Sequence, residues 1–140
     1  MKDEIFQHCK ALRLSSTFAN NAVALDGENH QDYLIKLLQA EVAYREEKRI
    51  NLNLKQANLD LSKTFGNYQF KDIEIPPMLN EELIKEVDFL NRKENLIMYG
   101  QSGRGKSHLA TAIAIAACMK GKKVKFYRTS ALVNELVAAK

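Results

Sequence analysis

The residues best suited to chemistry in this sequence form one short segment, GQSGRGKS, at positions 100–107. Gly100, Gly105, Lys106 and Ser107 satisfy the pattern GxxxxGK[ST], which binds the phosphates of nucleoside triphosphates. Glycine permits turns that a side chain would forbid, and it lets the main chain approach the phosphates closely. A helix that follows adds partial positive charge at its N-terminus, so aligned N–H groups and the helix dipole both favour an anion. This phosphate loop therefore predicts an ATP-binding site.

Two residues of the phosphate loop have individual predicted roles. Lys106 supplies a full positive charge for the β- and γ-phosphates, and it is the predicted catalytic residue. Ser107 carries a hydroxyl suited to Mg²⁺ alongside phosphate oxygens and water, so it is the predicted metal ligand. Arg104 either adds charge near the phosphates or is exposed to solvent, and His108 fits packing or exposure better than catalysis. The predicted nucleotide-binding set is Gly100, Gln101, Ser102, Gly103, Arg104, Gly105, Lys106, Ser107 and His108.

A strand before the loop and a helix after it are needed to position such a site. Residues 96–99, LIMY, form a short apolar run typical of a strand that is buried on both faces. Residues 106–119 form an alanine-rich helix that Gly121 ends. Residues 124–127 alternate like a second strand, and a last helix capped by Ser130 follows. This order of elements predicts an α/β fold with a parallel-sheet core.

Helices are predicted along most of the chain ahead of the loop. Apolar residues at helical spacing predict short helices over about 5–12 and 18–25, and a longer helix over about 31–50. Asn80 caps a further helix that ends near Asn91. A helical region thus precedes the predicted core.

Composition divides the chain into three parts. Residues 63–77 lie in a stretch without clear periodicity that ends in Pro76-Pro77, so they are the predicted linker. Residues 1–62 are the predicted helical N-terminal region, and residues 78–140 are the predicted start of a nucleotide-binding core.

Charge and cysteine content limit the binding partners, metal sites and cellular location that we expect for the protein. The net charge is +4, with 13 Lys and Arg against 16 Asp and Glu before Leu96, and 8 against 1 from Leu96 onward. The excess of basic residues from Leu96 onward is typical of a phosphate-binding fold, and the more specific alternative is that this part also binds nucleic acid. Cys9 and Cys118 lie far apart without metal-ligand spacing, so both are predicted to be buried thiols. With no membrane span or signal peptide in the sequence, we expect a cytoplasmic protein.

Two longer stretches carry a resemblance to a known family. The stretch ENLIMYGQSGRGKSHLATAIAIAACMKGKKVKFYRTSALVNEL and the upstream stretch EVAYREEKRINLNLKQANLDLSKTFGNYQF resemble the IstB-like and DnaC-like AAA+ ATPases. These are helper ATPases of insertion-sequence transposition and bacterial helicase loaders. Family members of the first type more often read GPPGTGKTHLA. Gln101-Ser102 replace the proline pair here, Arg104 replaces a threonine, and Ser107 replaces a threonine while keeping the hydroxyl.

The resemblance implies an AAA+-like P-loop NTPase that binds ATP and Mg²⁺, assembles on DNA as a homo-oligomer, and acts on a transposase or a replicative helicase. It also implies that Phe65, Tyr68 and Phe70 lie near the adenine ring, although packing in the core is an equal alternative for each.

Hydrolysis in this class also needs an acidic residue on a later strand and an arginine finger. After Ser107 the sequence has one carboxylate, Glu135, which falls on the last predicted helix. We therefore expect an incomplete core from a fragment or truncated gene, one that folds poorly and turns over little ATP alone. In the family's sheet order, later strands separate residues 96–99 from residues 124–127, so both segments would expose unpaired edges.

Four functions remain open from the sequence. The leading one is the ATPase module of a DNA transposition helper, and the second is a DnaC-like helicase loader. The third is a non-catalytic interaction protein whose N-terminal helices bind a partner while a degenerate core senses nucleotide. A small-molecule kinase fits least, because the long helical region precedes the loop.

Overall fold

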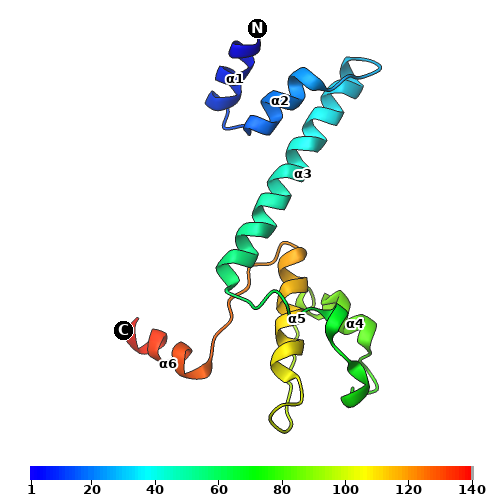
Figure 1. Ribbon diagram of the computed structural model, residues 1–140, viewed down its shortest axis with the longest axis vertical. Coiled ribbons are helices and arrows are strands. Elements are labelled where there is room, and N and C mark those ends of the chain that lie inside the picture. Colours follow the sequence, from blue (N-terminus) through cyan, green and yellow to red (C-terminus); the bar gives the residue numbers. More distant parts are fainter. Residues whose placement is uncertain (140) are drawn as a thin grey trace. The chain divides into compact units, whose positions relative to one another are not determined.

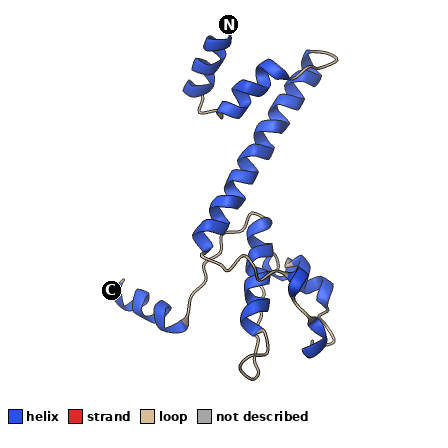
Figure 2. Ribbon diagram, in the orientation of Figure 1, coloured by secondary structure: helices blue, strands red, loops and turns tan. Residues whose placement is uncertain are grey.

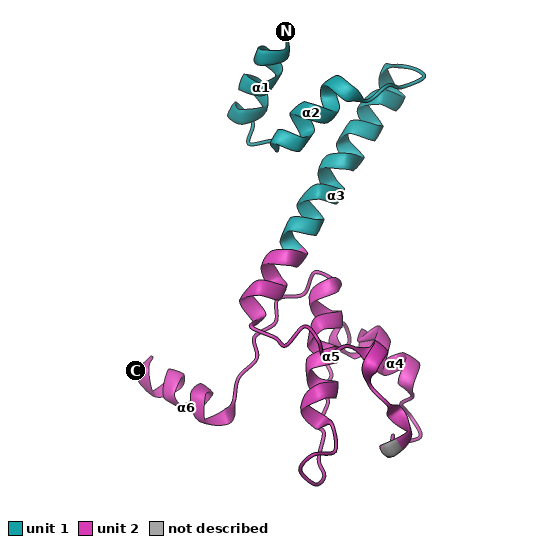
Figure 3. Cartoon of the chain, viewed as in Figure 1, with its two compact units in different colours: residues 1–49 teal, residues 50–140 magenta. Residues whose placement is uncertain are grey.

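The computed structural model describes residues 1–139, apart from the side chain of Asp72. Two compact units divide the chain, residues 1–49 and residues 50–140 (Figure 3). The described elements (Figure 1) are α1 (Lys2–Ala11), α2 (Ser16–Ala24), α3 (His30–Ala57), η1 (Phe65–Asn67), η2 (Phe70–Asp72), α4 (Glu81–Glu86), η3 (Asp88–Leu90), α5 (Lys106–Met119) and α6 (Thr129–Ala138). The predicted division at residues 62 and 77 stays a prediction.

The first unit is organised around the start of α2. Ser15 caps this helix, because its hydroxyl oxygen accepts a hydrogen bond from the Phe18 N–H at 2.9 Å. The side chain of Glu41, on α3, accepts hydrogen bonds from both the backbone N–H and the hydroxyl of Ser15. Arg45 donates to the same carboxylate at 2.7 Å and to the Arg13 carbonyl at 3.0 Å. One buried carboxylate thus ties α3 to the turn between α1 and α2.

The pKa of Glu41 reflects this position. Burial acts to raise the pKa, but the hydrogen bonds from Ser15 and Arg45 and the charge of Arg45 together lower it below its ordinary value. The ionised form is therefore the one that stabilises the folded unit. This stabilisation is full above the ordinary pKa of glutamate and is lost as the pH falls through the lowered pKa.

We expect Glu41→Ala to lower the free energy of unfolding by about 1–3 kcal/mol, because it leaves the Ser15 N–H without its acceptor. The free energy of unfolding of the variant should also fall less between neutral and acidic pH than that of the wild type, because the variant has no Glu41 carboxylate to protonate. Denaturant unfolding followed by circular dichroism, at neutral and at acidic pH, measures both effects. Glu46→Ala is the matched control on the same helix, since Glu46 is exposed and pairs with exposed Arg49. A loss as large in the control as in Glu41→Ala would contradict the assignment.

The second unit has its core beside α5. Buried side chains from α4, η3, α5 and the residue between α4 and η3 form this cluster, and they are Ile84, Val87, Phe89, Leu109 and Ile113. Asn80 caps α4, because its side-chain oxygen accepts from the Leu83 N–H at 2.8 Å. The predicted helix from Asn80 to Asn91 is interrupted, since Val87 is left-handed at φ 48° and a 3-10 turn follows it. Burial of the Val87 side chain compensates for this uncommon backbone conformation.

The prediction of an α/β fold with a parallel-sheet core is wrong for the described part of the chain, where no residue forms a strand (Figure 2). Residues 96–99 bury only one face, whereas the sequence predicted burial on both faces. Leu96 and Met98 pack against the core cluster, whereas Ile97 and Tyr99 are 83% and 93% exposed. A strand also needs a neighbour to bond, and within residues 1–139 no backbone hydrogen bond joins residues 96–99 to residues 124–127. Alternation alone therefore did not produce a sheet.

The helical predictions agree better with the structure. Helices occur near all the predicted positions, although α3 is longer than expected. The predicted cap at Ser130 is wrong, because α6 begins at Thr129, its N-cap is Arg128, and Ser130 lies inside the helix. Lys140, the last residue of the predicted final helix, lies outside the described residues. Cys9 and Cys118 are both buried free thiols, as predicted. In the part of the chain that the structure describes, no helix has the length and apolar character needed to cross a membrane.

Candidate phosphate-binding site

The backbone of the phosphate loop requires glycine at its turns. Gly103 and Gly105 have φ values of 79° and 80°, and Gly100 has 136°. These lie in the region that residues with a side chain rarely adopt. Gly105 is also the N-cap of α5, so the loop and the helix meet at a left-handed residue. The glycine spacing of the motif thus corresponds to a specific backbone path.

The first turn of α5 presents backbone donors at the end of this loop. The first intrahelical hydrogen bond runs from the Leu109 N–H to the Gly105 carbonyl at 2.9 Å. The N–H groups of Lys106, Ser107 and His108 precede it, and the N–H groups of a first turn have no intrahelical acceptor. Gly105 offers no capping side chain, so an anion can accept from these donors.

The amine of Lys106 is folded back across the loop. Its Nζ donates to the Gly100 carbonyl at 2.8 Å and to the Gln101 carbonyl at 2.6 Å. The positive charge is therefore held at the loop by two neutral carbonyl acceptors. A phosphate oxygen carries negative charge and forms a stronger, charge-assisted hydrogen bond with an ammonium group, so it can replace these carbonyls.

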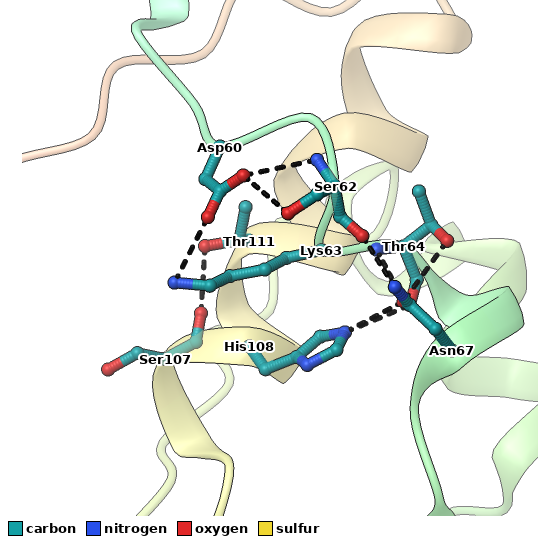
Figure 4. Close-up of polar contacts among 8 residues, drawn as sticks. All are labelled: Asp60, Ser62, Lys63, Thr64, Asn67, Ser107, His108 and Thr111. Atoms are coloured by element: carbon teal, nitrogen blue, oxygen red, sulfur yellow. Dashed lines mark hydrogen bonds and ion pairs between the residues drawn. The ribbon is translucent and has the colours of Figure 1, made fainter.

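Ser107 has a hydroxyl available for a cation. The residue is exposed, and in Figure 4 its hydroxyl points away from Thr111 and His108. Its carbonyl instead accepts from the Thr111 hydroxyl at 2.8 Å. Among residues 1–139 there is no group of three or more His, Cys, Asp or Glu side chains that could hold a metal. A Mg²⁺ ion at this site would thus rely on the Ser107 hydroxyl, phosphate oxygens and water.

The other predicted binding residues differ in exposure. Gln101, Ser102 and Arg104 are exposed, whereas His108 is half-buried. The His108 ring points to the linker: its Nε2 lies 3.1 Å from the Thr64 carbonyl and 3.0 Å from the Asn67 side-chain oxygen (Figure 4). This agrees with the alternative that the ring packs, and its backbone N–H still belongs to the first turn.

The linker aromatics pack against the core. The rings of Phe65 and Phe70 have centroids 6.3 Å apart, and the Tyr68 ring stands edge-on to Phe70 at 5.0 Å. All three pack against the core cluster. Core packing, one of the two alternatives from the sequence, is therefore observed, and contact with adenine stays a prediction.

Sequence reasoning missed how closely the linker approaches the loop. A Cβ added to Gly105 would lie 3.1 Å from Cε2 of Tyr68. The Tyr68 ring also stands edge-on to the His108 ring, with centroids 5.3 Å apart. These partners are separated by about 40 residues in sequence, so helical or strand periodicity carried no signal for the contact.

Comparison with known proteins supports this interpretation of the loop. The sequence model of the family described as IstB-like ATP binding protein matches residues 8–140, which include the whole phosphate loop. The chain belongs to the IstB-like family.

Several relatives of this IstB-like chain carry the same kind of name. The insertion sequence IS5376 putative ATP-binding protein of Geobacillus stearothermophilus is 31% identical over 97% of this chain and 56% of its own length. The corresponding IS21 protein of Pseudomonas aeruginosa is 32% identical over 80% of the chain and 42% of its length. The insertion sequence IS232 putative ATP-binding protein of Bacillus thuringiensis is 34% identical over 76% of this chain and 43% of its own length. The chain thus spans about half the length of these relatives.

Proposed function

We propose that this IstB-like chain binds the triphosphate of ATP, together with Mg²⁺, as the nucleotide-binding module of a DNA transposition helper ATPase. The observation that supports it most is the loop geometry. Left-handed glycines lead into the first turn of α5, and the Lys106 ammonium lies over the same loop. The backbone N–H groups of residues 100–108 would receive the phosphates, Lys106 would pair with the β- and γ-phosphates, and Ser107 would hold Mg²⁺.

The biological setting is part of the proposal. The relatives are named for insertion sequences, which favours transposition over helicase loading. DNA and a transposase are the proposed partners, in a cytoplasmic homo-oligomer. The strongly basic balance from Leu96 onward supports contact with nucleic acid.

Calorimetric titration of the 140-residue chain with nucleotides tests the binding step. We expect ATP to bind at least about tenfold more tightly than AMP, because charge-assisted hydrogen bonds to the outer phosphates are lost with AMP. Removal of Mg²⁺ with EDTA should weaken ATP binding, and Ser107→Ala should reduce this dependence on Mg²⁺. Ser130→Ala is the control, since it removes an exposed hydroxyl from α6. Equal affinity for ATP and AMP would contradict a site built around phosphates.

A further inference from the structure

The first turn of α5 is joined to the linker through one side chain. His108, on that turn, brings Nε2 within 3.1 Å of the Thr64 carbonyl and 3.0 Å of Asn67 Oδ1. We call this set of three residues, Thr64, Asn67 and His108, the linker contact. Figure 4 shows the His108 ring directed at the Asn67 side chain beside the turn formed by residues 62–64.

The hydrogen-bond partners of Asn67 fix the direction of the contact. The Asn67 side-chain oxygen accepts from the Thr64 N–H at 3.0 Å, and its amide nitrogen donates to the Ser62 carbonyl at 2.6 Å. The amide cannot be turned around without placing two donors together at Thr64 and two acceptors together at Ser62. Both atoms that face His108 Nε2 are therefore acceptors, and Nε2 must carry the proton.

The linker contact places Tyr68 against the phosphate loop. Asn67 ends η1, and Tyr68 follows it directly, so holding Asn67 also holds the start of the Tyr68 backbone. The Tyr68 ring stands edge-on to the rings of both His108 and Phe70, and its Cε2 lies 3.1 Å from an added Cβ on Gly105. Gly105 is the left-handed residue at which the loop becomes the helix. One side of the phosphate loop is thus supported by the linker.

We propose that His108 is a positioning residue for nucleotide binding, whose Nε2–H holds residues 62–68 on α5 and so keeps Tyr68 beside Gly105. This inference rests on the proposed function for the loop. In this proposal the His108 ring binds the linker, and only the backbone N–H of His108 contacts phosphate.

A coupling between the two sites follows from this arrangement. If docking of residues 62–68 favours the conformation of the loop that binds phosphate, then bound nucleotide must favour docking of residues 62–68 by the same factor. The linker leads toward the N-terminal helices along the chain, so the contact gives nucleotide a route to affect the segment that precedes the loop.

The test compares His108→Ala with His108→Gln in the full chain, by calorimetry with Mg²⁺ and ATP and by hydrogen exchange of residues 62–68. We expect His108→Ala to raise the Kd for ATP by about threefold to tenfold, the effect of losing one or two neutral hydrogen bonds. ATP should slow exchange in residues 62–68 of the wild type, and this protection should be lost in His108→Ala at saturating ATP. His108→Gln should restore both, because its amide nitrogen can occupy the place of Nε2. Asn67→Ala, which leaves α5 unchanged, should match His108→Ala.

His8→Ala serves as the control, since His8 is an exposed histidine in the first unit. Unchanged affinity and unchanged protection in His108→Ala would overturn the proposal, and so would a Gln variant as impaired as the Ala variant. Absence of ATP binding by the wild type would instead contradict the proposed function. In that event, exchange is compared without nucleotide. Faster exchange of residues 62–68 in His108→Ala than in the wild type would still support docking of these residues by His108, and equal exchange would overturn it.

Discussion

Replacing Lys106 by alanine is expected to weaken ATP binding by about tenfold to a hundredfold, the range for a charged hydrogen bond. The folded loop already holds the Lys106 ammonium at the Gly100 and Gln101 carbonyls, at 2.8 and 2.6 Å. Bound phosphate would exchange these neutral acceptors for charged ones, so the lysine contributes more to the complex than to the free protein. Titration calorimetry measures the loss directly.

The control separates the local role of Lys106 from the basic charge of this half of the chain. Lys123→Ala removes the same charge from an exposed position after α5, and it should change the affinity much less. The free energy of unfolding of Lys106→Ala should lie within about 0.5 kcal/mol of the wild-type value. The two carbonyls that lose the lysine lie in an exposed loop and can accept hydrogen bonds from water. Equal losses of affinity in the two variants would indicate a diffuse electrostatic effect in place of a phosphate site.

The sequence predicted the helices and the loop well because their signals are local. Asn80 caps α4 and Gly105 precedes α5 where the sequence places them, since capping and left-handed turns depend on a few neighbouring residues. Helix breaks inside a favourable pattern were harder to foresee. Val87 is a β-branched residue that is both left-handed and buried in the core, and no local pattern indicates this combination.

The sheet was predicted from a signal that is incomplete by itself. Residues 96–99 were predicted to be buried on both faces, but Leu96 and Met98 face the core while Ile97 and Tyr99 face solvent. Alternation reports which side chains face the core, but a sheet also depends on a partner at about 4.8 Å across the hydrogen bonds. Neither residues 96–99 nor residues 124–127 have a backbone hydrogen-bonded partner among residues 1–139, and so neither segment forms a strand there.

The linker contact was beyond sequence reasoning for a related reason. The sequence analysis singled out the aromatic side chains of Phe65, Tyr68 and Phe70, and it placed His108 in the predicted nucleotide-binding set, but no pattern indicated that these side chains meet. Their approach depends on how η1 packs on α5, which is a tertiary property. Amide and imidazole groups are also common in loops, so Asn67 and His108 carried no distinguishing pattern.

Gly105→Ala is expected to lower the free energy of unfolding by about 2–4 kcal/mol, since two costs arise together. The backbone at φ 80° is strained for any residue with a Cβ. The new methyl group would also lie 3.1 Å from Cε2 of Tyr68, whose ring already stands edge-on to the rings of Phe70 and His108. Chemical denaturation of the variant and the wild type measures the difference.

Gly103→Ala is the matched control, because Gly103 has nearly the same φ, 79°, but nothing within 4 Å of an added Cβ. It should lose only the strain, about 1–2 kcal/mol. The excess in Gly105→Ala then measures the contact with Tyr68, and it should disappear when both glycine variants are made in a Tyr68→Ala background. If instead the two glycine variants cost the same with Tyr68 present, the linker does not press on the phosphate loop, and the support inferred for Gly105 is wrong.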